Sequence, residues 1–398
     1  MREGWEYKKL GEIGNIVTGS TPSTKDESNY SPREYCFVKP SDLPSKGIAN
    51  IKETEYYVSK KGLSRSRVLP SGSVLVSCIG SIGKIGILTK EACSNQQINA
   101  IIPNNGIDSK FIAYIICAYR FLLESIANAP VVPIINKTDF SKIAIPIPPK
   151  FTQLAIVSEL DKINELIRLK NEQLKDLDKL AQNIFYEMFG DPVENEKGWT
   201  IQHLGDLCDK ISNGYNAKLE ENTYKSEGIM YFRCQNVWRN HFDYSDLVYI
   251  DENTNQKMKS SSLKHNDFLI TKIGRINTEN SSLGRVSLYE GEDDKANLSG
   301  NLCFARLKQG AAVHKFILYI LISNQFRNYI RRTTVGGIDK RALNVRQICS
   351  FPIISPPLPL QHLFAHRIEQ IEHQKSEVQK AITNLETLLA SRMQYWFE

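Results

Sequence analysis

The residues that come closest to a catalytic motif are a short glycine-containing run, a group of histidines and a pair of prolines. The run Cys78-Ile79-Gly80-Ser81-Ile82-Gly83-Lys84-Ile85 invites comparison with a nucleotide-binding loop. Such a loop needs glycine where Cys78 stands, and a Ser or Thr hydroxyl for Mg²⁺ where Ile85 stands. The run is therefore predicted to be a Gly-Lys turn between two strands, with Lys84 exposed toward a phosphate group.

The histidines and the prolines also fall short of known catalytic patterns. His362, His366, Glu369 and His373 have helical spacing, but a zinc protease requires His-Glu-x-x-His, and Leu363 follows His362 here. Solvated histidines on a helix face are the expectation. Ser355-Pro356-Pro357-Leu358 is the nearest match to the Asn/Asp-Pro-Pro-aromatic motif of amino-methylation, and it lacks both the amide and the aromatic residue. We predict no catalysis, no metal site and no cofactor in this chain.

Composition indicates a soluble protein of two or more domains. The 398 residues are 41% hydrophobic and 24% charged, with a formal net charge of +6. The basic excess is concentrated in residues 1–150 and 191–358. The eight cysteines form no CxxC pair, which favours reduced thiols in a cytoplasmic protein. The longest apolar run, Phe111 to Tyr119, is about half of a membrane span and is predicted to be a buried helix. No signal peptide and no membrane attachment are expected.

The strands and helices that would position the functional residues belong to an internal repeat of the sequence. Gly4-Trp5 and the eight residues after it recur from Gly198-Trp199, and Leu69 through Gly80 matches Leu263 through Gly274. Gly80 and Gly274 are 194 positions apart, whereas Gly83 and Gly284 are 201 apart, so the second copy contains an insertion of seven residues. Ser109 to Ile115 matches His314 to Ile320, and Pro148-Pro149 with Gln153 matches Pro356-Pro357 with Gln361. The chain consists of two copies of one module.

Each copy has short β-rich runs, an apolar helix, a proline-rich stop and then a long helix. Ser73 to Ser77 and Asp267 to Thr271 are typical of strands. We assign residues 1–150 to module 1, 151–190 to a long helix, 191–358 to module 2 and 359–398 to a second long helix.

The two long helices share a seam of apolar residues at alternating spacings of four and three, which is typical of a coiled coil. The alternative is that each helix packs only on its own module. Two such helices can pair antiparallel and hold the modules apart. Phe185, Met188 and Phe189, with Met393, Trp396 and Phe397, are expected to form a docking surface for another subunit. The seam residues are Leu160, Ile163, Ile167, Leu174, Leu177 and Ile184, then Ile368, Ile371, Val378, Ile382, Leu385 and Leu389.

Several segments carry a family resemblance: Thr18-Gly19-Ser20-Thr21-Pro22, Leu69 to Lys84, Asn95-Gln96-Gln97 and Ile145 to Pro149. They look like one target-recognition domain of the specificity (S) subunits of bacterial Type I restriction–modification enzymes. Gln153 to Asp191 is similar to the central conserved helix of that family. The second copy repeats the pattern. Thr152 and Leu360 stand where the family often has Glu, and Asn213-Gly214-Tyr215 replaces the Gly-x-Thr-Pro run.

The resemblance implies a mixed α+β fold, with two pseudo-repeated α/β target-recognition domains joined by two long antiparallel coiled-coil helices. Each domain would read one half of a split site in double-stranded DNA. The helix pair would set the spacing and bind two methyltransferase (M) subunits, and restriction (R) subunits would complete the enzyme. S-adenosylmethionine, ATP and Mg²⁺ would be bound by these partners, while this chain would be non-catalytic.

Sequence reading needs polar side chains at base edges and basic side chains on backbone phosphates. The phosphate candidates are Lys39, Lys84 and Lys137, then Arg233, Lys272, Arg275, Arg285, Lys340 and Arg341. The base-edge candidates are Thr18, Ser20, Thr21, Ser41, Asn95, Gln96, Gln97 and Asn99, then Asn213, Gln235, Asn236, Asn297 and Asn301. Each one alone could be an ordinary loop residue, and the prediction lies in the two clusters.

Three other functions fit parts of the sequence. One is the specificity subunit of a related two-subunit restriction system, which a co-purifying partner would distinguish. Another is a nuclease or methyltransferase in its own right, which the missing motifs disfavour. The third is a coiled-coil scaffold without salt-dependent affinity for DNA.

Overall fold

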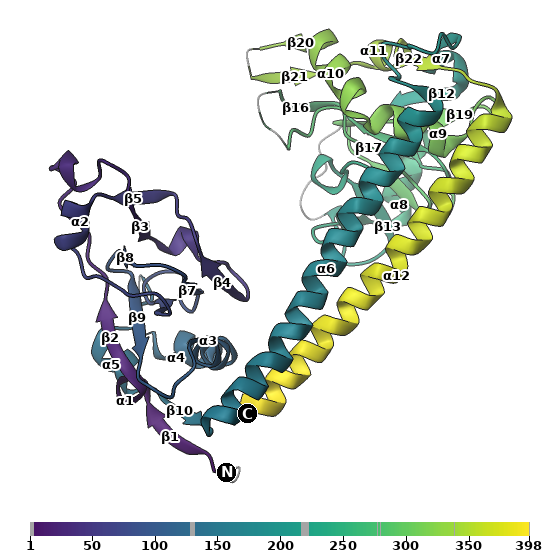
Figure 1. The fold of residues 1–398 in the computed structure, drawn as a ribbon. Helices are drawn as coiled ribbons and strands as arrows, with labels where there is room; N and C mark the ends of the chain where they lie inside the picture. Colours follow the sequence, from purple (N-terminus) through teal and green to yellow (C-terminus); the bar gives the residue numbers. More distant parts are fainter. Residues whose placement is uncertain are drawn as a thin grey trace. The chain divides into compact units, whose positions relative to one another are not determined.

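The computed structural model of this chain divides into two compact units, each built around one copy of the repeat (Figure 1). The structure describes residues 4–127, 132–215, 223–276, 278, 280–337 and 339–397. Unit 1 comprises Met1–Asn171 and Lys380–Glu398, and unit 2 comprises Glu172–Gln379. Each unit therefore contains one module and a part of both long helices.

Module 1 is built on a five-stranded sheet in the order β2-β9-β6-β7-β4, with a three-stranded sheet β5-β3-β8. A short ladder β1-β10 joins the two ends of the module. The strands are β1 Glu6–Lys9, β2 Gly14–Thr18, β3 Tyr35–Val38, β4 Ile48–Ile51, β5 Tyr56–Val58, β6 Val74–Ser77, β7 Ile85–Leu88, β8 Ala92–Ser94, β9 Ile98–Pro103 and β10 Ala144–Ile147. The helices are α1 Leu10–Ile13, η1 Glu27–Asn29, η2 Pro40–Asp42, α2 Lys60–Ser64, α3 Ser109–Ala118, α4 Arg120–Ile126 and α5 Lys137–Lys142.

Module 2 repeats this architecture with sheets β12-β19-β15-β17, β14-β13-β18 and β11-β22, and adds a small sheet β16-β21-β20. The strands are β11 Ile201–His203, β12 Cys208–Asn213, β13 Ile229–Phe232, β14 Val248–Ile250, β15 Phe268–Thr271, β16 Ile273–Arg275, β17 Val286–Leu288, β18 Ala296–Leu298, β19 Leu302–Leu307, β20 Val335–Gly336, β21 Lys340–Ala342 and β22 Pro352–Ile354. The helices are α7 Leu204–Leu207, η4 Cys234–Asn236, α8 Glu252–Lys257, η5 Lys259–Ser261, α9 His314–Ile322, α10 Asn324–Thr333 and α11 Val345–Cys349.

Strand pairing confirms that the modules are copies of one fold. β6 pairs antiparallel with both β7 and β9, and β15 pairs antiparallel with both β17 and β19. β3 runs parallel to β8, as β13 does to β18. The predicted strands are confirmed as β6 and β15, and Gly83 and Lys84 form the predicted turn between β6 and β7. The expected exposure of Lys84 is wrong, because its side chain is half-buried and donates to the Pro40 carbonyl. The apolar run from Phe111 forms the buried face of α3.

A buried glutamine holds the start of each long helix. Gln153 is 1% exposed; its Oε1 accepts from the Asp108 backbone N–H at 2.9 Å, and its Nε2 donates to the Pro148 carbonyl at 2.9 Å. Gln361 makes the same two contacts, with the Val313 N–H at 2.9 Å and the Pro356 carbonyl at 2.8 Å. The glutamine thus ties the apolar helix and the proline-rich stop to the long helix in both modules.

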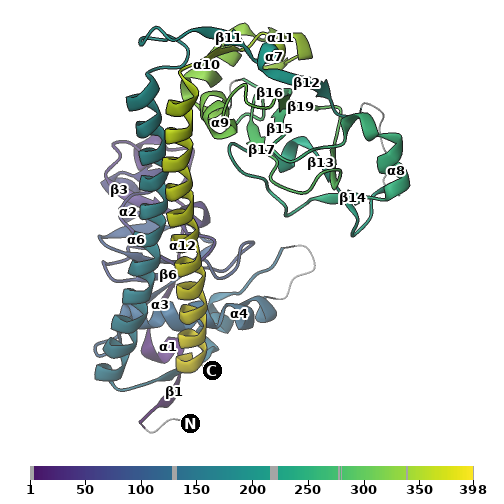
Figure 2. The same cartoon turned by 90° about the vertical axis from the view of Figure 1, so that its right-hand side faces the viewer.

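The long helices are α6 (Lys150–Phe189) and α12 (Leu358–Phe397), which run side by side in antiparallel directions within each unit (Figure 2). In unit 1, Glu159 near the start of α6 bonds Arg392 and Trp396 near the end of α12. In unit 2, Lys375 pairs with Asp178. The antiparallel helix pair is confirmed.

The seam residues are buried or half-buried, and part of the seam packs on the modules themselves. Leu160 belongs to the core of module 1 together with Ile156 and Phe397. The buried seam residues are Leu160, Ile163, Leu177, Ile368, Ile371, Val378 and Ile382, and the half-buried ones are Ile167, Leu174, Ile184, Leu385 and Leu389. The helices therefore pack both on each other and on the modules.

The expected docking surface at the helix ends is wrong for three of its residues. Phe185 and Phe189 are buried and pack on Phe316 of α9, at ring-centroid distances of 6.0 and 4.7 Å. Phe397 is buried against Phe111, at 5.8 Å. These rings anchor the helices to their modules, because large apolar side chains gain more from a core than from solvent.

Candidate nucleic-acid interface

In each module the same four segments meet at one edge: the end of the first long strand, the 3₁₀ turn, the turn before the last long strand and the turn after the central strand. In module 1, Ser20 N–H donates to the Ser94 carbonyl at 2.8 Å, and Asn95 N–H donates to the Val38 carbonyl at 3.1 Å. Cys78 N–H, just after β6, donates to the Gln97 carbonyl at 2.8 Å. Backbone bonds thus bring the predicted polar residues of module 1 together.

The equivalent backbone bonds are present in module 2. Tyr215 N–H donates to the Leu298 carbonyl at 2.9 Å, and Ser299 N–H donates to the Phe232 carbonyl at 2.9 Å. Lys272 N–H donates to the Asn301 carbonyl at 3.0 Å. The second polar cluster therefore occupies the same place on the same frame.

A glycine is required where the first long strand leaves each sheet. A Cβ on Gly19 would lie 2.1 Å from the Asn95 carbonyl oxygen, and a Cβ on Gly214 would lie 2.3 Å from that of Ser299. Real Cβ atoms do not approach backbone oxygen so closely, so both loops depend on the missing side chain. Gly214 is thus the structural equivalent of Gly19, although the residues around it differ.

Side chains of the first polar cluster bond one another. Thr18 Oγ1 donates to Asn99 Oδ1 at 2.7 Å, and Thr21 Oγ1 donates to Gln96 Oε1 at 2.6 Å. Asn95 Nδ2 donates to Gln97 Oε1 at 2.8 Å. Among these candidates, Thr21, Ser41 and Gln96 are exposed, Thr18, Ser20 and Gln97 are half-buried, and Asn95 and Asn99 are buried.

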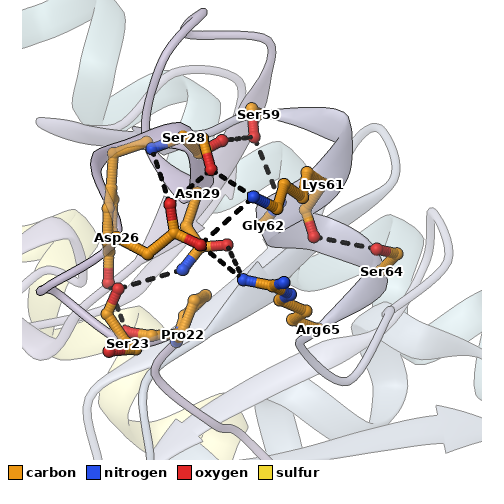
Figure 3. Close-up of polar contacts among 11 residues, drawn as sticks. Pro22, Ser23, Asp26, Ser28, Asn29, Ser59, Lys61, Gly62, Ser64 and Arg65 are labelled. Atoms are coloured by element: carbon orange, nitrogen blue, oxygen red, sulfur yellow. Dashed lines mark hydrogen bonds and ion pairs between the residues drawn. The ribbon is translucent and has the colours of Figure 1, made fainter.

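A network of charged and polar side chains stabilises the loop that follows β2 (Figure 3). Asp26 accepts hydrogen bonds from Arg65 at 2.7 Å and Lys61 at 3.2 Å, and Asn29 Nδ2 donates to the Ser23 carbonyl at 3.0 Å. The hydrogen bond from Ser28, followed by those from Arg65 and Lys61, holds the pKa of the Asp26 carboxyl well below its usual range. The network therefore ties the loop that follows β2 to helix α2, which contains Lys61.

The cations of module 1 lie around this cluster. Lys39 Nζ lies 3.1 Å from the centre of the Tyr56 ring, and Lys84 Nζ donates to the Pro40 carbonyl at 3.2 Å. Both are half-buried, whereas Lys137 is exposed at the start of α5. Arg67, which the sequence analysis did not single out, donates to the Thr18 carbonyl at 2.6 Å.

In module 2 five of the eleven candidates line an open cleft of about 850 Å³, here called the recognition cleft. Gln235, Arg275, Asn301 and Lys340 are exposed on its walls. β16 and β21 carry the basic pair, with Arg275 opposite Lys340. Arg275 also forms an ion pair with Asp339 at 3.4 Å.

Asp246 is the acidic centre of the recognition cleft. Its carboxylate accepts from Arg233 at 3.2 Å, from Gln235 at 3.2 Å and from Asn236 at 2.7 Å. Asp246 thus aligns three candidates of the 3₁₀ turn η4. A carboxylate in this place can also accept a hydrogen bond from the exocyclic amine of cytosine. The Nε of Arg233 is buried and has no hydrogen-bond partner in the described part of the chain.

Lys272 connects the turn after β15 to the end of β12. Its Nζ donates to Asn213 Oδ1 at 2.6 Å, and both side chains are half-buried. Burial lowers the pKa of Lys272. Arg341, on β21, donates to the carbonyls of Arg331 at 2.8 Å and Thr334 at 3.1 Å, so its guanidinium is largely engaged within the module.

Several candidates are placed inside the modules by the fold. Asn236 and Asn297 are completely buried, and Asn297 bonds Ser261, Asn255 and the Met258 carbonyl. Arg285 is 8% exposed and lies 3.7 Å over the Trp238 ring. With Asn95 and Asn99, the two buried asparagines of module 2 shape the loops, because their polar atoms bond other buried groups of the module. Arg285 is mostly buried but lines the recognition cleft.

The structure also reveals residues that the sequence analysis missed, above all Trp238 and the arginines Arg239, Arg327 and Arg331. Arg327 and Arg331 are four residues apart on α10, a spacing that places them on one face of a helix. That spacing was visible in the sequence. The approach of Arg239 from a different segment was not.

Other potential sites are sparse in the described residues. Three or more His, Cys, Asp or Glu side chains never gather there in a way that could hold a metal ion. The histidines His362, His366 and His373 are exposed on α12, and all eight cysteines are free thiols. Of the helices that the structure describes, none is both long and apolar enough to span a membrane.

Comparisons with known proteins place this geometry in context. The family model described as "Type I restriction modification DNA specificity domain" matches residues 2–179 and again residues 196–387. The Type I restriction enzyme MjaIX specificity subunit of Methanocaldococcus jannaschii is 25% identical over 404 residues, which cover 96% of this chain and 90% of the relative.

Two solved structures share the fold over nearly the whole chain. The S subunit of a Type I restriction–modification system from M. genitalium has a TM-score of 0.55 at 13% identity, covering 99% of this chain and 96% of its own. A chain from a study of assembly and conformational transition of the type I restriction–modification system has a TM-score of 0.60 at 18% identity, covering 99% of this chain and 97% of its own. Both support the assigned fold class.

Proposed function

Because this chain belongs to the Type I restriction–modification DNA specificity family and carries the family's domain twice, it is a specificity subunit, and we propose that each module reads one half of a bipartite DNA site. The observation that carries this proposal is the pair of polar clusters at equivalent edges of the two modules. The central strands correspond, with β2-β9-β6-β7 matching β12-β19-β15-β17 and β5-β3-β8 matching β14-β13-β18, whereas the exposed side chains on them differ. Two frames with different side chains suit two different base sequences.

The chemistry of the clusters suits duplex DNA. Amide and hydroxyl groups such as Gln96, Thr21, Gln235 and Asn301 can bond base edges, while nearby Lys and Arg side chains neutralise phosphates. Such contacts release counterions, so the affinity should fall steeply with salt. The exposed members of each cluster remain the predicted base contacts, and the buried ones are proposed to position the loops.

The partners follow from the same proposal. Two M subunits would bind the paired helices and methylate adenine with S-adenosylmethionine, and R subunits would use ATP and Mg²⁺ for translocation and cleavage. The helix pair would act as the spacer that sets the distance between the half-sites. This chain would perform no catalysis itself.

The test is selection from randomised duplexes, with the full chain alone and together with its candidate methyltransferase partner. The expected result is enrichment of two short motifs separated by a spacer of fixed length and indifferent sequence. Enrichment of one uninterrupted motif, or salt-independent retention of every sequence, would contradict the proposal. A single co-purifying restriction subunit would instead favour the related two-subunit system.

A further inference from the structure

A basic pocket of about 610 Å³ lies in module 2 between the segment after η4, the insertion before β17 and helix α10. Its walls include Arg239, Arg285, Arg327 and Arg331, with Trp238 beside them. Among the described residues that line the pocket, none is acidic. The guanidinium groups of Arg239, Arg285 and Arg331 repel one another, and an anion that enters the cavity relieves this repulsion.

One arginine forms a fixed wall of the pocket. The Arg285 guanidinium stacks 3.7 Å over the Trp238 ring, and its Nε donates to the Ser281 carbonyl at 3.1 Å. Trp238 also stacks on His241, with ring centroids 6.0 Å apart. These contacts hold the positive charge of Arg285 in place without neutralising it, because carbonyl oxygens and rings carry no net charge.

Two other arginines are positioned to contact a ligand. Arg239 Nη1 donates to Asn324 Oδ1 at 3.3 Å, and Arg331 Nη2 reaches the Thr278 carbonyl only at 3.5 Å. The Nε of Arg331 is buried and has no hydrogen-bond partner within the described residues. Burial, and then the neighbouring charge of Arg331, lowers the pKa of Arg239. Donor capacity therefore remains on both side chains.

The pocket continues directly into the recognition cleft, since Trp238, Asn280, Ser281 and Arg285 line both. A ligand in the pocket would thus lie next to the predicted base contacts. Arginine binds phosphate oxygens through two parallel N–H donors, which matches this arrangement. We propose that this pocket binds a backbone phosphate of DNA beside the half-site of module 2, an inference that rests on the proposed function.

Module 1 lacks this arrangement among its described residues. The arginine of its equivalent helix, Arg120 on α4, pairs with Glu124 at 3.0 Å and donates to the Ser45 carbonyl at 2.6 Å. Ser45 stands at the repeat position of Arg239, which is 194 residues later. The phosphate pocket is therefore specific to module 2, so module 2 would make a phosphate contact beside its half-site that module 1 does not make.

The test compares the wild-type chain, the double variant Arg239→Gln/Arg331→Gln and the control Arg332→Gln, each in complex with the methyltransferase partner. Arg332 is exposed on α10 and does not line the pocket, so Arg332→Gln removes one positive charge outside it. Binding to the selected duplex is measured against salt, and again with single phosphates replaced by neutral methylphosphonates. Circular dichroism and melting confirm that each variant is folded.

The expected result is a loss of roughly tenfold in affinity for the double variant. Its slope of log K against log salt should fall by about one, and Arg332→Gln should leave both unchanged. One methylphosphonate beside the half-site of module 2 should weaken the wild type and have no further effect on the double variant. A double variant that matches Arg332→Gln on a split-site duplex would overturn the pocket and leave the proposed function intact.

The remaining outcomes separate the two proposals. A loss of salt slope without any split-site preference in the wild type would support the phosphate pocket and contradict the proposed function. An absence of salt-dependent DNA affinity would contradict both. A stabilisation of the wild type by inorganic phosphate that the double variant loses, with unchanged DNA binding, would assign the pocket to a free anion and overturn its assignment to DNA.

Discussion

Modules 1 and 2 share their central strands, a buried glutamine and a glycine at the edge of the sheet, yet they arrange their polar side chains differently. In module 1 the candidates bond one another in pairs, over a charged network centred on Asp26. In module 2 five of the candidates line an open cleft that includes Asp246, next to a pocket of arginines. The exposed side chains can therefore differ between the modules while the backbone fold stays the same, because the backbone hydrogen bonds that build the fold do not involve those side chains.

The largest effect is expected from the edge glycines. Gly19→Ala forces the Asn95 carbonyl away and should cost roughly 1–3 kcal/mol, with loss of recognition in the half-site of module 1 only. Gly214→Ala should do the same to the half-site of module 2. Selection from half-randomised duplexes measures both. Equal damage to both half-sites by either variant would show that the modules are not independent.

The next effect concerns the buried glutamines, which tie each module to its long helix. Gln153→Leu leaves the Asp108 N–H and the Pro148 carbonyl without their partner and should lower the free energy of unfolding by roughly 1–3 kcal/mol. Gln361→Leu is the matched variant in module 2. Denaturant unfolding of the full chain measures both losses. If the two losses of unfolding free energy differ by more than a factor of three, the hydrogen bonds of the two glutamines are not equivalent.

Base-edge candidates should affect one half-site each. Gln96→Ala in module 1 and Gln235→Ala in module 2 should each cost about 1–3 kcal/mol against the selected sequence and relax the preference at one position. Competition binding with single-base variants of the duplex gives both values. A uniform loss against all sequences would assign the residue to the DNA backbone.

A smaller effect is expected for Lys272. Lys272→Ala should weaken binding about equally for all sequences and reduce the salt slope by about one. The exposed Lys308, which lies outside the recognition cleft, provides the control substitution Lys308→Ala. An unchanged slope would show that Lys272 holds Asn213 and does not contact phosphate.

The smallest effect is acid sensitivity in the loop network of module 1. The folded-state pKa of Asp26 is lowered from 3.8, so the stabilisation by its ion pairs is complete above that value and declines as the pH falls from 3.8 toward the lower folded-state pKa. Thermal unfolding between pH 5 and pH 3 should decline more steeply in the wild type than in Asp26→Asn. If the wild type and Asp26→Asn show the same dependence of melting temperature on pH, the ion pairs of Asp26 do not stabilise the loop.

Much of the fold could be predicted from the sequence, because repeats and apolar periodicity are local patterns. The strand at Val74–Ser77, the turn at Gly83-Lys84 and the paired helices followed from such patterns. The phenylalanines at the helix ends were misjudged, because a sequence does not show which face of a module they meet. Phe189 lies against Phe316, a contact that only tertiary structure brings about.

The candidate site was predictable as two clusters and less so as individual side chains. Residue type favoured Asn297, but its position in the middle of the buried strand β18 places it in the core. Arg239 and Trp238 were missed, because their role depends on the approach of α10 from almost ninety residues further along the chain. Burial and long-range packing decide which polar residues remain available to a ligand.

The most direct test of independent reading is an exchange of residues 1–150 for the corresponding module of another member of the family. The chimera is assembled with its methyltransferase partner, and its target is selected from randomised duplexes. We predict that one half of the recognised site changes while the other half and the spacer length stay the same. A change in both halves, or in neither, would contradict the assignment of one half-site to each module.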